Sequence, residues 1–345
     1  MAKCDIGHEA PPAGLFKYGS RYMQLTAELI KTYAKSTGFD LCGITTPETP
    51  ERDVARYKKW LAKGLHADLD YMERNVERRC APALSQHGVR SIIMLALNYY
   101  QTDTEAVDSG YGRVARYARG RDYHKIFETR IRALLREIHT NHPKLNIREN
   151  FKYFVDYGPF LERCYAEKAG LGYIGKNSML ITEEYGSWVM LAEILTTVEL
   201  QPDEPNQKRH GHCGACQRCM LHCPTGAIIA PGVVDTSKCI SYLTIEKRGE
   251  IEQELRAKIG DKIFGCDICQ EVCPHNHPKQ RSIRTDDNEF LPLAGVGEFI
   301  NLQEILSLKS REEFLKLTAG TALTRPKLEG LRRNAEVCLE NEETQ

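Results

Sequence analysis

The sequence reads CGACQRCMLHCP from Cys213 to Pro224, and this stretch decides the fold of the region around it. Its cysteines follow the spacing C-x2-C-x2-C-x3-C-P, in which three closely spaced thiolates hold one [4Fe–4S] cluster and the fourth reaches a neighbouring cluster. A second run, CDICQEVCP from Cys266 to Pro274, has the same ending but carries Ile263 where its first cysteine is expected. Together the two runs predict a module that holds two clusters.

The missing thiolate of the second run has one local replacement, Cys239, which lies between the runs. With it, eight cysteines serve two clusters and none is left over. We predict that Cys213, Cys216, Cys219 and Cys273 hold the first cluster, and that Cys223, Cys239, Cys266 and Cys269 hold the second. Two Cys4 zinc sites are the alternative, but zinc gives no reason for the three-cysteine run or the crossed Cys-Pro ending.

Composition places the chain among redox proteins of a reducing compartment. It has 345 residues and 47 side chains of each charge, so its net charge points to neither a nucleic-acid nor a membrane partner. No apolar run approaches the roughly 20 residues of a membrane helix. Eight of the 13 cysteines crowd between Cys213 and Cys273, unlike a secreted disulfide framework. We expect a cytoplasmic protein without membrane contact, with an N-terminal extension at residues 1–20.

The periodicity of apolar residues divides the rest of the chain. Residues 21–200 are expected to form one catalytic domain of the α+β class, with a mixed or largely antiparallel sheet. Its helices are predicted at 23–37, 123–139 and 160–169, and its strands at 39–44, 89–97, 151–155, 178–181 and 188–195, the last two around a turn at Gly186. The cluster module then occupies 208–280, and 281–345 form a C-terminal segment with helices at 302–308, 311–317 and 327–339.

The first domain is the expected place of chemistry, because a free-standing electron carrier does not need so long a chain ahead of its clusters. Its segment YFVDYGPF, from Tyr153 to Phe160, sets one carboxylate among aromatic residues where a strand ends. Desolvation there would raise the pKa of Asp156 and make it a proton donor. The alternative is an Asp whose side chain caps the turn that follows it.

Two further stretches suggest ligand contacts. GLGYIGKNS, from Gly170 to Ser178, has the backbone freedom of a loop that lies close to a large ligand, but it lacks the spacing of a nucleotide phosphate loop. Between Tyr111 and Arg136 basic residues alternate with tyrosines, which suits phosphates or RNA, or a solvated helix face in its second half. These basic residues are Arg113, Arg116, Arg119, Arg121, Lys125, Arg130, Arg132 and Arg136.

Five motifs in order resemble the epoxyqueuosine reductase family, cobalamin-dependent iron–sulfur enzymes that complete queuosine in tRNA. The resemblance spans about residues 22–341. Its motifs are ARYARGRDYH at 115–124, VDYGPFLER at 155–163, AGLGYIGKN at 169–177, CISYLTIE at 239–246 and IFGCDICQ at 263–270.

The resemblance implies a nitroreductase-like cobalamin-binding domain, a bacterial-ferredoxin-like module with two [4Fe–4S] clusters, and short C-terminal helices. It implies that Asp156 is the proton donor above the cobalt. The residues implied to line the corrin pocket are Arg79, Tyr117, Asp156, Arg163, Lys176, Asn177, Ser178 and Ser241.

The implied reaction is the two-electron reduction of the epoxide of epoxyqueuosine, at the wobble position of tRNA, to queuosine and water. An external electron donor is needed as a partner, besides the tRNA. Basic residues expected to contact the RNA phosphates are Lys247, Arg248, Arg325, Lys327, Arg332 and Arg333. The alternatives are a cobalamin and iron–sulfur reductase of the reductive dehalogenase kind, and an electron carrier without an active site of its own.

Overall fold

The computed structural model describes residues 24–104, 109–204, 213–276 and 283–344. The expected extension at residues 1–20 lies outside the described residues. In the part of the chain that is described, no helix is both long and apolar enough to cross a membrane.

A four-stranded antiparallel sheet forms the centre of the first domain, with the strand order β1-β2-β7-β4. These strands are β1 (Leu41–Thr45), β2 (Ser91–Asn98), β7 (Val189–Thr196) and β4 (Phe151–Phe154). All three pairings are antiparallel. The mixed helix-and-strand class, the largely antiparallel sheet and the positions of these strands agree with the predictions from the sequence.

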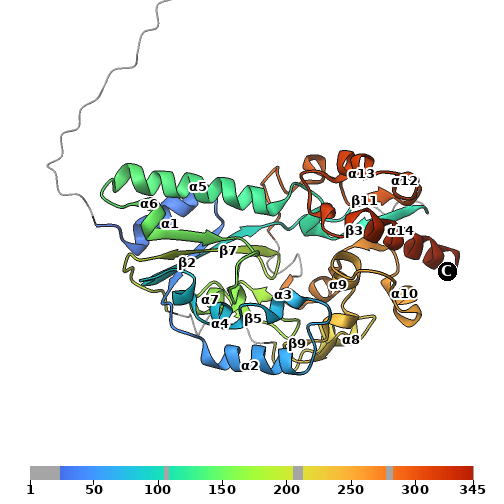
Figure 1. The fold of residues 1–345 in the computed structure, drawn as a ribbon, viewed down its shortest axis with the longest axis horizontal. Helices are drawn as coiled ribbons and strands as arrows, with labels where there is room; N and C mark the ends of the chain where they lie inside the picture. The colour runs from blue at the N-terminus through green and yellow to red at the C-terminus, as the bar shows by residue number, and fades with distance from the viewer. Residues whose placement is uncertain (1–23, 105–108, 205–212, 277–282, 345) are drawn as a thin grey trace, which may run out of the picture.

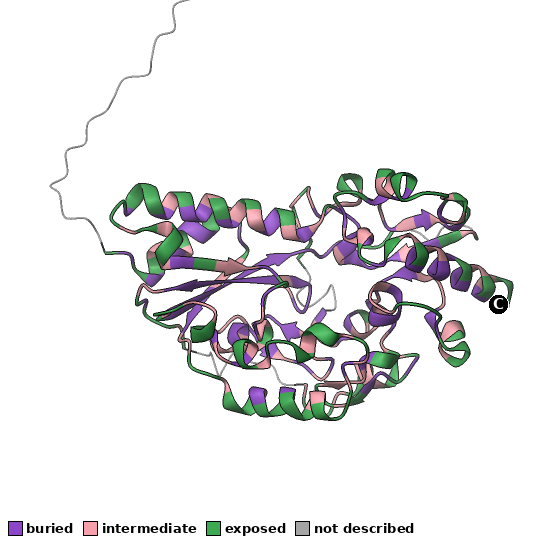
Figure 2. Ribbon diagram, viewed as in Figure 1, coloured by how far each residue is buried: buried purple, intermediate pink, exposed green. Residues whose placement is uncertain are grey.

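Both faces of this sheet are covered, which explains why β2 is apolar throughout. Successive side chains of a strand point to opposite faces. Ile93, Leu95 and Leu97 pack with helices α1 (Ala27–Ser36) and α5 (Tyr123–Asn141). Ile92, Met94 and Ala96 pack on the other face with α7 (Glu162–Lys168). In Figure 1, α1 and α5 lie on one side of the sheet and α7 on the other, and Figure 2 shows the strands between them buried.

One predicted pairing is wrong. The strands expected on either side of Gly186 do not pair with each other, because β7 is paired along its length with β2 and, over half of it, with β4. The short strand β6 (Leu180–Ile181) pairs with β5 (Tyr173–Ile174) instead. A single bridge between Thr182 and Gly186 closes the turn. A strand that is buried on both faces satisfies its backbone groups only within the central sheet.

Short elements fill the remaining parts of the chain. Below the sheet lie α2 (Glu51–Ala62), α3 (Asp70–Glu73) and α4 (Val76–Cys80), and α6 (Ile147–Asn150) precedes β4. The cysteine-rich region contains α8 (Arg218–Leu221), β8 (Ile228–Ala230), β9 (Val233–Val234), α9 (Ile240–Ile245), α10 (Gln253–Ile259), β10 (Lys262–Phe264) and α11 (Ile268–Glu271). The three predicted C-terminal helices are present as α12 (Leu302–Ser307), α13 (Arg311–Thr318) and α14 (Lys327–Glu343).

A second sheet joins the three expected parts of the chain by main-chain hydrogen bonds. Its order is β10-β3-β11, where β3 is Tyr111–Val114 and β11 is Phe299–Asn301. The central strand comes from the first domain, β10 from the cluster module and β11 from the C-terminal segment. Close approach requires glycine here, since a Cβ on Gly112 would lie 2.6 Å from the Cβ of Ile263. The cluster module is therefore fixed to the domain that precedes it.

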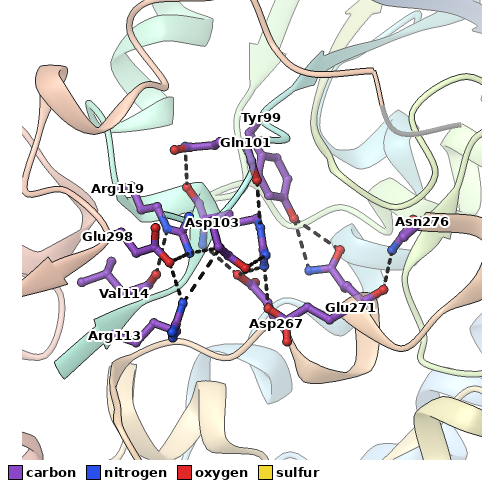
Figure 3. Close-up of polar contacts among 12 residues, drawn as sticks. Tyr99, Gln101, Asp103, Arg113, Val114, Arg119, Asp267, Glu271, Asn276 and Glu298 are labelled. Atoms are coloured by element: carbon purple, nitrogen blue, oxygen red, sulfur yellow. Dashed lines mark hydrogen bonds and ion pairs between the residues drawn. The ribbon is translucent and has the colours of Figure 1, made fainter. Parts of the chain in front are cut away.

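Buried arginines reinforce this junction (Figure 3). Arg119 is 1% exposed, and its Nη2 lies 2.8 Å from Asp103 Oδ1 and 3.3 Å from Glu298 Oε1. Arg116 donates to Asp267 at 3.2 Å and to Glu271 at 2.7 Å. Arg113 pairs with Glu298 and with Asp261. The expectation that the first half of the basic stretch contacts RNA is therefore wrong, because these guanidinium groups are used inside the protein.

The network makes a testable contribution to stability. Glu298→Gln should lower the free energy of unfolding by roughly 3 kcal/mol, the lower part of the range for breaking a buried ion pair, since Asp103 remains beside Arg119. Urea unfolding measures the change. Glu289→Gln is the matched control, because its partner Arg121 is largely exposed, and it should cost less than about 1 kcal/mol. Equal losses in the two variants would contradict a special role of the network.

Candidate functional site

The four cysteines predicted for the first cluster line one cavity. They are Cys213, Cys216, Cys219 and Cys273, and Lys176, Asn177 and Arg218 share the cavity wall. Two of these neighbours carry positive charge, which suits a cluster whose four thiolate ligands are negative. The structure thus brings the first predicted quartet together.

The other four cysteines are also neighbours, and all four are partly buried. The charge of Cys223 acts on Cys239, that of Cys239 on Cys266, and those of Cys266 and Cys239 on Cys269. Burial raises the pKa of the Cys266 thiol to about 12 and also raises those of Cys239 and Cys269. Such thiols become ligands only when a bound cation compensates the loss of hydration of the thiolate.

No three His, Cys, Asp or Glu side chains within the described ranges are arranged to hold a single metal ion. A [4Fe–4S] cluster instead takes one thiolate at each of its four irons. Because Cys213, Cys216, Cys219 and Cys273 line one cavity, they can together supply the four thiolates that such a cluster needs.

The glycine-rich loop supports the cluster loops directly. Lys176 Nζ donates to the carbonyl oxygens of Gly214 and Cys216, at 2.7 and 2.8 Å. Asn177 Nδ2 donates to the carbonyl of Cys269 at 3.3 Å. Ser241 follows Cys239 at the start of α9. These predicted corrin-pocket residues thus lie beside the cluster ligands.

The cluster assignment predicts about eight irons per chain after anaerobic reconstitution. Cys239→Ala should lose the second cluster and keep the first, because the first quartet does not include it. Iron analysis and EPR of the reduced protein measure both effects. Cys164→Ala is the control, since this thiol lies in α7 outside both quartets, and its iron content should equal that of the wild type. About two zincs and little iron in the wild type would reject the assignment.

Asp156 stands at the end of β4 in an unusual backbone conformation. Its φ is 60°, a left-handed value that non-glycine residues seldom adopt. The N–H of Asp156 donates to Glu162 Oε1 at 2.9 Å, and its Oδ2 accepts from the hydroxyl of Tyr123 at 2.7 Å. His124 Nε2 lies 3.9 Å from the same oxygen. The surrounding contacts hold the carboxylate in a conformation that it would not adopt alone.

Both predictions for the environment of Asp156 need correction. Its side chain is 60% exposed, so the expected desolvation by neighbouring aromatics is absent. It also bonds to Tyr123 of α5, rather than to the turn that follows it, among the described residues. The exposed carboxylate is available to a ligand, and the hydrogen bond from Tyr123 orients it.

Charged and aromatic side chains from distant parts of the chain surround Asp156. The charges of Asp156, Glu246, Arg325 and Arg79 all act on Tyr71. Burial, followed by the charge of Glu246, raises the pKa of Tyr71 to about 12, although 42% of this side chain is accessible. Tyr71 therefore lies among charged groups that come from distant parts of the chain.

Two of the predicted pocket residues also border this site. Burial, followed by the charge of Asp156, raises the pKa of Tyr117. Arg79 donates to the carbonyl of Gly158 at 3.4 Å and to that of Tyr71 at 3.3 Å. Arg163 donates instead to the carbonyl of Ser178, so this bond links α7 to the glycine-rich loop. Sequence reasoning missed Tyr71, Tyr123 and Glu246, because their roles arise only from packing.

Two carboxyl groups near Asp156 were also missed, of which Glu162 is partly buried and Glu193 fully buried. Burial, followed by the negative charge of Asp156, raises the pKa of Glu162 to about 8. Glu193 is 0% exposed. Its burial, and next the negative charge of Glu162, raise the pKa of Glu193 well above the ordinary range. The sequence did carry a signal for Glu193, which is a lone carboxylate in the apolar run VMLAEILT of β7.

The residues predicted to contact RNA fall into three groups. Lys327 is exposed and Arg332 half-exposed, and the structure gives neither an ion pair within the described residues. Lys247, Arg248 and Arg325 keep accessible surface but already bond to Glu252, to carbonyl oxygens and to Glu246, respectively. Arg333 is 7% exposed and donates to the carbonyls of Lys247, Gly249 and Leu243. Its expected RNA contact is therefore wrong, since its guanidinium is used within the fold.

The fold and the site define an iron–sulfur protein in which a module with two cysteine quartets is fixed to a sheet domain carrying the Asp156 site. Two family models match: "4Fe-4S double cluster binding domain" over residues 212–276 and "Epoxyqueuosine reductase QueG, DUF1730" over residues 79–157. The chain is 39% identical over 305 residues to the epoxyqueuosine reductase of Leadbetterella byssophila, covering 88% of this chain and 95% of that protein. It is 38% identical to the Escherichia coli enzyme of the same name, covering 87% and 76%. The chain belongs to the epoxyqueuosine reductase family.

Solved structures of the family share the fold. A crystal structure of epoxyqueuosine reductase with an epoxyqueuosine-modified stem loop of tRNA-Tyr has a TM-score of 0.81, with 32% identity, covering 91% of this chain and 80% of that one. A structure of the Bacillus subtilis enzyme, described as having its aspartate catalytic loop swung out of the active site, has a TM-score of 0.79 at the same identity, with 91% and 81% coverage.

Proposed function

We propose that the chain reduces the epoxide of epoxyqueuosine, in the anticodon of tRNA, to the alkene of queuosine and water. The observation that carries this proposal is the similarity to epoxyqueuosine reductases, at 39% identity over 95% of the length of one of them. The site supports it, because Asp156 is an exposed carboxylate that the hydroxyl of Tyr123 holds in one orientation. The direct test is liquid chromatography and mass spectrometry of nucleosides from epoxyqueuosine-tRNA after incubation with reduced protein.

Cobalamin is the cofactor proposed for the space around Asp156, and the residues there suit it. Tyr71 and Tyr117 offer partly accessible aromatic surface whose hydroxyls have lost hydration, and the Nε of Arg79 is buried without a hydrogen-bond partner among the described residues. Ser241, Lys176, Asn177 and the pair Arg163 and Ser178 complete the proposed border on the side of the clusters. When bound, cobalamin supplies a low-valent cobalt that delivers electrons to the epoxide carbon.

Asp156 is the proposed proton donor to the departing epoxide oxygen. Breaking the C–O bond leaves negative charge on that oxygen, which a positioned carboxylic acid neutralises. Tyr123 and the N–H contact with Glu162 hold Asp156 in place. Arg79 fixes the following turn through the carbonyl of Gly158.

The proposed arrangement of the chain follows from these roles. Residues 21–200 hold cobalamin and perform the chemistry, 208–280 carry the clusters, and 281–345 add helices on the RNA side. An external donor passes electrons to the clusters one at a time, and the tRNA substrate is consistent with a location in the cytoplasm. The two alternatives predict different results: an electron carrier would not retain a corrin, and a dehalogenase-like reductase would leave epoxyqueuosine-tRNA unchanged.

The role of Asp156 is tested by Asp156→Asn, which keeps the shape but cannot donate a carboxylic proton. Turnover should fall at least roughly 10²-fold, the lower bound for a general acid, while iron, corrin and tRNA affinity stay the same. Single-turnover reduction by the pre-reduced protein is the measurement. Tyr123→Phe should have a smaller effect, since it removes only the orienting hydrogen bond. Turnover near that of the wild type in Asp156→Asn would remove this residue from the mechanism.

The RNA surface is tested at Lys327 and Arg332, which form no ion pair within the described part of the chain. Replacing both Lys327 and Arg332 by Ala should weaken binding of the anticodon stem-loop and reduce its salt dependence, because each phosphate contact releases counterions. Fluorescence anisotropy at several salt concentrations measures both effects. The control is the double change Lys58→Ala and Lys59→Ala, on the exposed face of α2. Equal effects of the two double variants would show only non-specific attraction.

A further inference from the structure

Glu193 occupies a position where a carboxylate has no structural reason to be. It lies in the middle of β7, opposite Met94 of β2 and Phe154 of β4. Residues two positions before and after it, Leu191 and Leu195, belong to the apolar cluster under α7. Because side chains alternate along a strand, Glu193 points into this cluster. An isolated charge buried there would be strongly unfavourable.

The neighbour of Glu193 is a second carboxyl group. Neither of its oxygens meets a hydrogen-bond donor among the described residues, and the group that faces it is the carboxyl of Glu162, at the start of α7. Two carboxylates repel each other, but one proton between them converts the repulsion into a hydrogen bond. The pair is therefore built to hold a proton.

Glu162 connects the pair to the catalytic residue. Its Oε1 accepts the N–H of Asp156 at 2.9 Å, and the same carboxyl group faces the buried Glu193. The other charged groups facing Glu162 are Arg163 and Arg79. Tyr123 and Tyr157 are the titratable groups that face the pair from the sides.

The proposed reaction needs more protons than Asp156 holds. Reducing an epoxide to an alkene and water consumes two electrons and two protons. Both C–O bonds break, the two electrons come from the external donor, and the oxygen leaves as water. Asp156 supplies one proton and is then a carboxylate. Once an RNA loop lies over the site and restricts the access of water, a proton source inside the protein can deliver the second proton faster.

We infer that Glu162 and Glu193 form a buried proton store that reloads Asp156 within one catalytic cycle. This inference rests on the proposed function. The pair passes its one proton, through Glu162, to the Asp156 carboxylate, and both members of the pair are then carboxylates. The pair regains its proton from solvent after the product leaves. Glu162 also positions Asp156 through the N–H contact.

The store is tested first without any substrate. Infrared spectroscopy at neutral pH should show the carbonyl stretching band of a protonated carboxyl, which shifts in deuterium oxide. Glu193→Gln should remove this band, because its amide donates to Glu162 and leaves that group as a carboxylate. Glu199→Gln, at an exposed carboxylate three residues beyond the end of β7, should leave the band unchanged. Absence of the band in the wild type would overturn the store, whatever the activity.

Single-turnover kinetics provide the second test. In the wild type, activity should fall as the pH rises through about 8, because Glu162 then loses its proton. In Glu193→Gln this fall should move to lower pH, and the rate at pH 7 should drop about 10-fold, less than for a direct general acid because water can partly replace the store. Glu162→Gln gives an independent variant if Glu193→Gln does not fold. A wild-type rate and pH profile in either folded variant would overturn the inference. A wild type that does not reduce epoxyqueuosine-tRNA would overturn the proposed function, and with it the role of the proton store in catalysis.

Discussion

The position of Arg116 is the constraint on which the rest of the structure depends. Electrons reach a substrate only if the clusters are held at a fixed place relative to the catalytic residues. The guanidinium of Arg116 lies over the ring of Trp188 at 4.9 Å and donates to Asp267, which stands between two cluster cysteines. Its Nε donates to the carbonyl of Gln101, in the segment that follows β2. One guanidinium thus ties the sheet domain to the second cluster loop.

Because this network is buried, its ion pairs can form in only one arrangement of the chain. A buried charge without a partner is much less favourable than one in water, so each arginine requires its carboxylate at one position. Asp103, Asp267 and Glu298 come from three distant parts of the chain, and all three must be placed correctly before the arginines are satisfied. The shared β10-β3-β11 sheet brings these segments together through the backbone, and the ion pairs fix their side chains.

Three carboxyl groups near the site show how environment separates chemical roles. Asp156 is exposed and oriented by Tyr123, so it can meet a substrate. Glu162 and Glu193 lie where hydration is lost, and burial favours their protonated forms. The carboxyl group at the surface can therefore donate a proton to a substrate, while the pair below it stores one. The left-handed backbone of Asp156 adds strain that the contact with Glu162 helps to maintain.

The sequence by itself determined the local elements, the cluster-binding class and the family. Cysteine spacing indicates cluster ligands because a short loop must wrap around a cubane, and the periodicity of β2, α5 and α14 follows from burial of their apolar faces. Tertiary structure alone decided the fate of charged residues. Arg116, Arg119 and Arg333 are as basic in the sequence as Lys327, but only packing shows that they bond to carboxylates or carbonyls inside the fold. The same holds for Asp156 and Glu193, because a carboxyl group's protonation depends on its hydration and neighbours, which distant segments supply.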